Sequence, residues 1–372
     1  MKIRINEKQY IKLNEAVGVP TNIVEVARQL YEKIMSELNP DDDLETQFNK
    51  PIIFKGDFQI GNYKFKKIKI YFKLEDLNDY TFTNIEKPKV LLSSMTHHGK
   101  VEMNAKFNYE VSQNLNTVTL SIIFAVDNDT TSQDVINEFK KEKVVMISSL
   151  AHELKHAYDE SVNSLVQTHK RVDYKIGNER RFGDILPLNK FLNYMYFAHT
   201  TENLVRASEI FAALEENGIT KKDFYNFITN HKTYTMYKEG SELTYEGLRN
   251  ELKSIVPNIK KTFDDNGIYY PKNISDDDMV SLTLLKFFET LLNWKAGIMN
   301  ELLSNNFLEM MLGFSGRKQK YFENYLKKIG RFGGDYERYF KYEINQIRYI
   351  CRKMMKKISK LYSLINEKNP SE

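Results

Sequence analysis

Cysteine is nearly absent from this chain of 372 residues, whose one cysteine is Cys351. A single thiol cannot form an internal disulfide, and it excludes every zinc site that is built from several thiolates. The chain also has no apolar run of about eighteen residues, the length that a membrane-spanning helix needs. Its first residues alternate charged and apolar side chains, without the apolar core of a secretory signal. We therefore expect a cytoplasmic protein of a reducing compartment, with no membrane as a partner.

An excess of charge of one sign is also missing, because the net charge of +4 is small for this length. Such a balance does not by itself indicate nucleic acid or an anionic membrane as a partner. Aromatic residues are plentiful instead: 23 tyrosines and 23 phenylalanines indicate a folded protein with a ring-rich core. A chain of this length usually exceeds one compact core, so we expect two or three packed parts.

The hydrophobic pattern predicts an α+β fold of three parts. Residues 1–50 form an N-terminal helical segment, whose clearest helix runs from Asn22 to Leu38. Residues 51–217 begin with period-two alternation, typical of a small antiparallel sheet, and continue with helices. Residues 218–372 form a mostly α-helical C-terminal domain, with one of the expected breaks near Gly240. The expected strands are 52–60, 63–74, 90–93, 101–111 and 117–126.

Residues 151–158, with the sequence AHELKHAY, carry the most specific chemical signal. His152 and His156 are four residues apart, so on a helix they lie one turn apart on the same face and can bind one ion. Glu153 projects from the same region, placed as the catalytic base that takes a proton from zinc-bound water. An apolar stripe supports a helix over 144–162, namely Ile147, Leu150, Leu154 and Ala157. The alternative interpretation is a structural helix with two incidental histidines.

A catalytic zinc ion takes three protein ligands and keeps one open position, so a third ligand must come from elsewhere in the chain. The downstream pattern predicts a helix from Thr201 to Gly218, on which Glu202, Arg206 and Glu209 share one face. Glu202 is the candidate ligand, and Glu209 and His199 remain alternatives. The structural alternative is a solvated face on which Arg206 pairs with both glutamates.

These two motifs resemble those of the gluzincin group of zinc metallopeptidases. The likeness covers residues 100–217 and rests on HELKHA at 152–157 and on Glu202-x-x-Val-Arg-Ala. It implies a zincin-like metallopeptidase domain over 51–217, in which the small antiparallel sheet packs on the two zincin-type helices. An extended peptide could then add to the sheet beside its last strand, residues 117–126, by main-chain hydrogen bonds. The implied function is zinc-dependent hydrolysis of peptide bonds in a peptide or protein substrate.

The resemblance also implies roles for single residues. Glu202 would bind Zn2+, and Glu209 or Asp159 would orient one of the histidine ligands from a second layer around the ion. Lys155 departs from the uncharged residue that gluzincins usually have inside the motif. A metzincin is excluded, because Asp159 and Val162 occupy the positions of its required glycine and third histidine.

A second resemblance concerns the opening residues MKIRINEKQYIKLNE, which are similar to the start of proteins encoded by tailed bacteriophages. It implies an alternative function, a zincin-like structural or binding component of a larger assembly such as a phage virion. Such a virion-associated protein would bind assembly partner proteins and would have little or no hydrolytic activity.

Residues 317–360 are locally basic, with fourteen Lys or Arg against four acidic residues, and they are interleaved with aromatic residues. This pattern suggests contact with nucleic acid through 317–360, because rings can stack on bases. A solvated pair of helices with an aromatic seam is the favoured interpretation, since charge runs usually mark exposed faces. Cys351 lies in this segment without an evident base or acid partner, so we expect an unreactive thiol.

Overall fold

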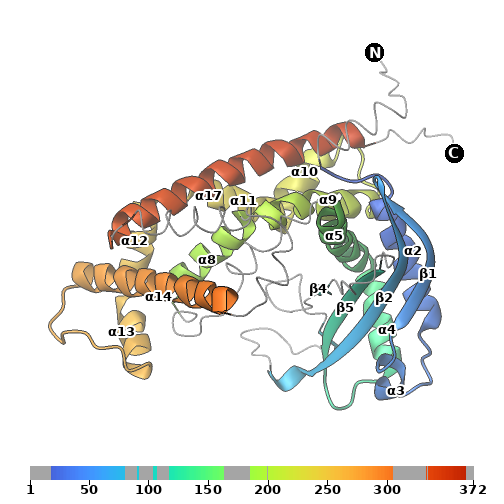
Figure 1. Ribbon diagram of the computed structural model, residues 1–372, viewed down its shortest axis with the longest axis horizontal. Helices are drawn as coiled ribbons and strands as arrows, with labels where there is room; N and C mark the ends of the chain where they lie inside the picture. The colour runs from blue at the N-terminus through green and yellow to red at the C-terminus, as the bar shows by residue number, and fades with distance from the viewer. Residues whose placement is uncertain are drawn as a thin grey trace. The chain divides into compact units, whose positions relative to one another are not determined.

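The computed structural model shows a chain that divides into two compact units (Figure 1). The described residues are 18–79, 90–91, 104–106, 117–162, 185–198, 200–304, 332 and 334–365. Unit 1 comprises the described residues up to 162, with 204–231 and 357–365, and unit 2 comprises 185–198, 200–203, 232–304, 332 and 334–356. The fold is α+β and mostly helical, as predicted. The units interleave along the chain, so their limits differ from the three consecutive parts expected from the sequence.

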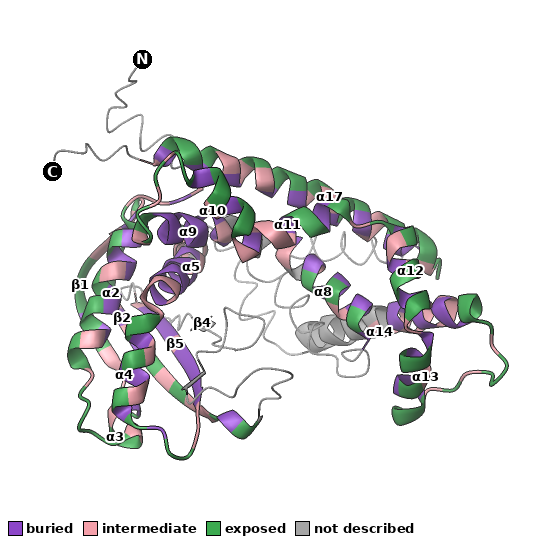
Figure 2. Cartoon of the chain, turned by 180° about the vertical axis from the view of Figure 1, so that it is seen from behind, coloured by how far each residue is buried: buried purple, intermediate pink, exposed green. Residues whose placement is uncertain are grey.

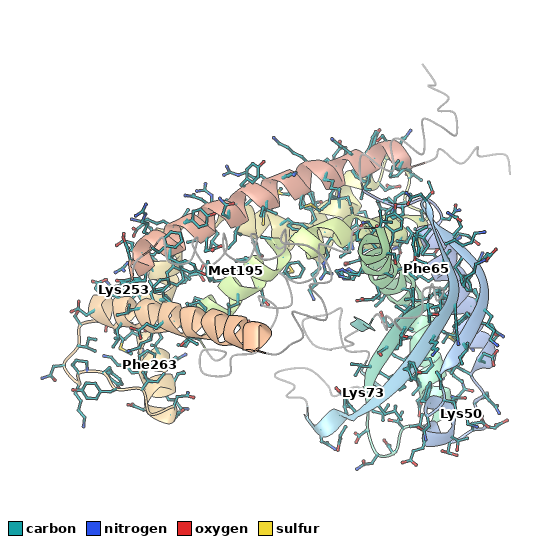
Figure 3. All side chains as sticks on the ribbon, viewed as in Figure 1. Lys50, Phe65, Lys73, Met195, Lys253 and Phe263 are labelled. Atoms are coloured by element: carbon teal, nitrogen blue, oxygen red, sulfur yellow. The ribbon has the colours of Figure 1, made fainter. Side chains whose placement is uncertain are left out.

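Unit 1 contains a sheet of five described strands, in the order β1-β2-β5-β3, with β4 also paired to β5. The strands are β1 (Ile52–Ile60), β2 (Tyr63–Asp76), β3 (Val90–Leu91), β4 (Asn104–Lys106) and β5 (Thr117–Val126). β1 and β2 form an antiparallel hairpin, whose turn uses Gly61 at a φ of 55°, a conformation that glycine adopts at little cost. Along β2, Phe65 is buried and Lys73 is exposed (Figure 3). The limits of β1 and β5 agree with the prediction.

The prediction of an antiparallel sheet was wrong, because β2 and β5 pair in parallel from Lys67↔Thr117 to Asp76↔Val126. The sheet is therefore mixed. Period-two alternation reports which face of a strand is buried, and it carries no information about the direction of the neighbouring strand. A parallel pair needs a crossover connection of a dozen residues or more, and residues 77–116 provide that length.

β5 is an interior strand. A substrate peptide was expected to add to the sheet beside residues 117–126, but other strands already pair with β5 on both sides. β2 pairs with β5 on one side, and β3 and β4 pair with it on the other. The nearly continuous burial of β5 is typical of a strand with a parallel neighbour and both faces covered. Of the other two expected strands, 90–91 and 104–106 are strands, and the remainder of 90–93 and 101–111 lies outside the described residues.

Unit 1 also contains helices. They are α2 (Ile23–Glu37), α3 (Leu44–Phe48), η1 (Leu77–Asp79), α4 (Ser132–Lys141), α5 (Lys143–Val162), α9 (Thr200–Glu216), α10 (Phe224–Asn230) and η3 (Lys360–Leu364). Of these, α2, α3, α4 and α5 contact the strands of the sheet. α4 begins with a capping box: Asp134 N–H donates to Thr131 Oγ1 at 3.2 Å, and the Asp134 carboxylate accepts from Thr131 N–H at 3.0 Å. α2, expected in a separate N-terminal segment, packs on α5 and β1 instead.

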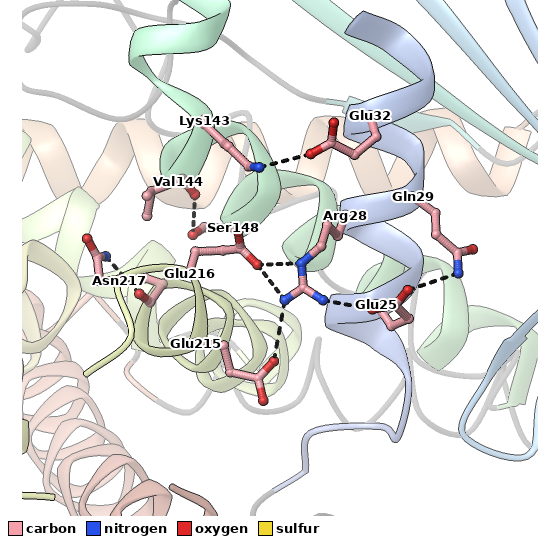
Figure 4. A network of polar contacts seen from close by, with 11 residues as sticks. Glu25, Arg28, Gln29, Glu32, Lys143, Val144, Ser148, Glu215, Glu216 and Asn217 are labelled. Carbon is pink, nitrogen blue, oxygen red and sulfur yellow. Dashed lines mark hydrogen bonds and ion pairs between the residues drawn. The ribbon is translucent and has the colours of Figure 1, made fainter. Parts of the chain in front are cut away.

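Arg28 of α2 holds the C-terminal end of α9 (Figure 4). Its Nε and Nη2 donate to Oε1 of Glu216 at 2.9 and 2.6 Å, and its Nη1 donates to Glu25 at 2.7 Å. The Glu216 side chain is 8% exposed, so this contact is partly shielded from water. A cation at the C-terminal end of a helix also interacts favourably with the helix dipole. The contact therefore stabilises the position of α9 in unit 1.

Unit 2 is helical in its described residues. Its helices are α8 (Leu186–Ala198), α11 (Lys232–Glu242), α12 (Tyr245–Ser254), α13 (Val256–Asp265), α14 (Asp276–Ser304) and α17 (Tyr336–Ser359), and α9 and α17 each continue across a limit between the units. The break expected near Gly240 falls at residues 243–244, between α11 and α12, and Gly240 itself lies within α11. There its backbone packs closely on Cys351 of α17, which requires a residue without a Cβ. In the described part of the chain, none of the helices combines the length and apolar character of a membrane span.

Candidate functional site

α5 is a buried helix that carries polar residues into the interior of unit 1 (Figure 2). Its predicted apolar stripe is confirmed, since the exposed fraction is 0% for Ile147, Leu150, Leu154 and Ala157. His152 and Glu153 are 8% and 9% exposed, and His156 is half-buried. Burying polar side chains costs free energy unless they are paired, so their partners define the site.

His152 and His156 approach each other on one side of α5. Their ring centroids are 4.9 Å apart and the rings are inclined at 74°. Oε1 of Glu153 lies 3.9 Å from Nε2 of His152. Two imidazoles and a carboxylate therefore occupy one region, as expected for residues one helical turn apart.

Glu209 of α9 contacts the other nitrogen of His152. Its Oε2 lies 3.1 Å from Nδ1 of His152 and accepts a hydrogen bond from Nη1 of Arg206 at 2.6 Å. Glu209 is 3% exposed. Arg206 precedes Glu209 by three residues on the same helix, so α9 supplies both the carboxylate and its counter-charge. Glu209 was considered both as an alternative zinc ligand and as a residue that orients a histidine ligand. This contact corresponds to the second role.

The surroundings of Glu209 keep its carboxyl group ionised. Burial by itself raises the pKa of this carboxyl. The charge of Arg206, the hydrogen bond with His152 and the charges of His152 and His231 act in the opposite direction and prevail, so that the pKa of Glu209 lies well below its usual range. A buried carboxylate is thus stabilised directly beside the first histidine of the motif.

An ionised Glu209 determines the hydrogen-bonding role of His152. A carboxylate only accepts hydrogen bonds, so Nδ1 of His152 carries the proton and donates it to Glu209. In the neutral ring, Nε2 is then the acceptor nitrogen, and Nε2 is the atom that lies nearer to Glu153. Histidines that bind metal ions usually have this arrangement, with the second nitrogen donating to a carboxylate or carbonyl group.

His231, the C-cap residue of α10, belongs to the same electrostatic environment and was missed in the sequence. Burial lowers the pKa of His231, the charge of Glu209 opposes this shift, and the charge of Arg206 adds to it. His231 lies in no motif, and the fold of unit 1 brings it within range of two charges on α9. Spacing along the sequence therefore offered no signal for it.

Asp159, considered as a residue that orients a histidine, has a different partner. It forms an ion pair with Lys155 one turn earlier on α5, and the exposed fractions of the two side chains are 14% and 5%. Burial lowers the pKa of Lys155, and the charge of Asp159 partly offsets this effect. The Lys155 ammonium also lies 5.5 Å from the ring centroid of Tyr158. Asp159 thus neutralises the charged residue that distinguishes this motif from the gluzincin pattern.

Of the three candidates for the third ligand, Glu209 is the one whose side chain lies within the described residues. Glu202 lies in the first turn of α9, and its side chain is outside the described residues, as is all of His199. Among the described side chains, no group of three or more His, Cys, Asp or Glu is arranged to hold a metal ion. The described part of the site is therefore a pair of imidazoles, with Glu153 beside them and Glu209 behind His152.

No family model, curated protein or solved structure matches this chain. The interpretation of the site therefore depends on the geometry and chemistry of its own residues.

Proposed function

We propose that this protein is a zinc-dependent metallopeptidase, with His152 and His156 as ligands and Glu153 as the catalytic base. The observation that carries the proposal is the contact between Glu209 and Nδ1 of His152. With Nδ1 in this contact, Nε2 is the acceptor nitrogen of the neutral ring, and it lies in the region that also contains His156 and Glu153. An incidental histidine on a structural helix would have no need of a buried, ionised carboxylate that selects one tautomer.

The chemistry of the donors suits zinc. Catalytic zinc sites combine three imidazole or carboxylate ligands with one open position. His152 and His156 offer two nitrogens, and Glu202 is the proposed third ligand. Glu202 precedes Glu209 by seven residues on α9, which places both glutamates on the same face of that helix, two turns apart.

Each side chain has a separate task in the proposed reaction. When bound, zinc would polarise the peptide carbonyl and increase the acidity of a water molecule. Glu153 takes the proton of the attacking water and delivers it to the leaving amine. Glu209, supported by Arg206, holds His152 in one orientation and one tautomer. The low exposure of these groups strengthens their electrostatic interactions relative to water.

The zinc content of purified, tag-free protein tests the metal site. We expect about one zinc ion per chain, as in other structural or catalytic single-zinc sites, and its loss in His156→Ala and in Glu202→Ala. Glu246→Gln, on an exposed position of α12, is the control and should retain zinc. Loss of zinc in His156→Ala but not in Glu202→Ala would support the histidine motif as the zinc site and reject Glu202 as the third ligand. Native protein that binds no zinc after dialysis against it would overturn the proposal.

Glu153→Gln separates an enzyme from a zinc-binding component of an assembly. The amide cannot accept a proton, so hydrolysis of a fluorogenic peptide library should fall at least about a hundredfold while zinc is retained. Zinc binding without hydrolysis in the native protein, under conditions that preserve the fold, would instead support the structural or binding alternative.

A further inference from the structure

The long helix α17 has two faces of different character. One face is buried and consists of Tyr339, Phe340, Ile344, Ile347, Cys351 and Met354. The ring of Phe340 lies 5.3 Å from that of Phe191 on α8 and 6.1 Å from that of Phe287 on α14, measured between centroids. These contacts hold one side of α17 in the core of unit 2. The other side consists of exposed and half-buried residues (Figure 2).

Cations dominate the exposed side. They are Arg338, Lys341, Arg348, Arg352, Lys353 and Lys356, all exposed except Arg348, which is half-buried. At about 100° per residue these six positions fall within about 140° of the helix circumference, opposite the buried face. From Arg338 to Lys356 the row extends about 27 Å, at about 1.5 Å per residue. We call these six residues the cationic face of α17.

Little negative charge compensates this face within the described part of the chain. Glu337, at its border, pairs with Lys341. Arg348 and Arg352 reach the carbonyl oxygen of Ser241, at 3.4 and 3.5 Å, a neutral partner at the edge of hydrogen-bond distance. Arg338, Lys353 and Lys356 have no carboxylate within ion-pair distance there. Like charges in a row repel one another, so such a face indicates an anionic partner.

We propose that the cationic face of α17 binds the phosphate backbone of nucleic acid. Duplex DNA carries one negative charge per about 1.7 Å of its axis, so a row of about 27 Å corresponds to roughly eight base pairs. Neutralising phosphates releases their condensed counterions, which gives affinity without any requirement for base sequence. Tyr349 lies among the cations and is 64% exposed, so its ring can stack on a base where a strand is open.

The composition of this face favours nucleic acid over an anionic membrane. Helices that bind at a membrane surface insert a face of Trp, Phe or Leu side chains beneath their cations. On α17, whose side chains are all described, Tyr349 is the one large hydrophobic residue that is exposed. The binding surface uses no residue of the proposed peptidase site, so the failure of one proposal would not affect the other.

Charge reversal on this face provides the test. The variant combines Arg352→Glu, Lys353→Glu and Lys356→Glu. The matched control combines Lys50→Glu, Lys55→Glu and Lys222→Glu, which are exposed positions outside α17, so both variants change the net charge by −6, from +4 to −2. The probe is a fluorescent DNA duplex of about 30 base pairs, titrated by anisotropy at salt concentrations from about 50 to 200 mM.

We expect the native protein to bind the duplex with an affinity that falls steeply with salt. The α17 variant should bind at least about tenfold more weakly and show a salt slope smaller by about 2 to 3, whereas the control should keep the native slope. No binding by the native protein, or an equal loss in both variants, would overturn the proposal. Binding to phosphatidylserine vesicles with no binding to the duplex would overturn it in favour of a membrane. Should the triple variant fail to fold by circular dichroism, Lys353→Gln and Lys356→Gln, each expected to reduce the slope by about one, replace it.

Discussion

Nδ1 of His152 lies 3.1 Å from Oε2 of Glu209, although 57 positions separate the two residues in the sequence. The contact joins α5 to α9, and Arg206 on α9 donates to the same carboxylate oxygen. A carboxylate on one nitrogen of an imidazole orients the ring and raises the basicity of the other nitrogen. The metal affinity of the motif on α5 should therefore depend on a residue of another helix.

Replacing Glu209 by glutamine should weaken zinc binding while leaving both histidines in place. We expect the dissociation constant for zinc to increase about 10 to 100 fold, because the neutral amide orients His152 less firmly and no longer raises its basicity. Competition with a chromogenic chelator measures the constant, and Glu246→Gln is the matched control on an exposed site. An unchanged zinc affinity in Glu209→Gln would reject the orienting role.

Replacing Asp159 should destabilise the protein much more than replacing its ion-pair partner Lys155. Asp159→Ala leaves a buried ammonium without its partner and should lower the free energy of unfolding by about 3 kcal/mol. Lys155→Met keeps the volume and leaves the Asp159 carboxylate unpaired, but at 14% exposure that carboxylate is less shielded from water than the ammonium at 5%, so the cost should be smaller, about 1 kcal/mol. The double variant should resemble Lys155→Met, as urea unfolding would show. Additive effects of the two substitutions would mean that the pair is not coupled in the folded protein.

Gly240→Ala should destabilise unit 2 even though alanine favours helices. A Cβ at this position would lie 2.7 Å from Sγ of Cys351 and 3.5 Å from Cδ1 of Tyr194. We expect a loss of about 1 to 3 kcal/mol from overpacking, against a helix-propensity gain of about 1 kcal/mol. In the background of Cys351→Ala, where Sγ is absent, Gly240→Ala should be neutral or stabilising. Thermal unfolding of the native protein, the two single variants and the double variant measures the effect of Gly240→Ala on stability in each background. Equal effects in both backgrounds would contradict the packing argument.

Cys351 should be unreactive in the folded protein. Burial raises the pKa of its thiol to about 12, so the thiolate that reacts with aromatic disulfides is scarce at pH 8. Labelling should therefore be slow without denaturant and rapid in guanidinium chloride. Because the folded pKa exceeds the unfolded value of 9.0, the thiol's contribution to stability is complete below pH 9 and is lost between pH 9 and about 12. Rapid labelling of the native protein would show that α17 opens or that the thiol is accessible.

Local patterns were sufficient to predict the elements that bear the site. The apolar stripe on α5 and the four-residue spacing of His152 and His156 specify a helix with two imidazoles on one side, because both follow from helical periodicity. Alternation specified the strands β1, β2 and β5. Each of these properties depends on residues that are near in sequence.

The sequence by itself determined the helices, the principal strands and the pair of histidines with Glu153. The tertiary structure decided which carboxylate contacts His152, because Glu209 and Asp159 have similar local chemistry, and packing places α9 beside Nδ1 while Lys155 pairs with Asp159. It also decided the parallel direction of β2 and β5 and brought His231 into the field of Glu209 and Arg206. These choices depend on contacts between segments far apart in the chain, which periodicity and spacing do not encode.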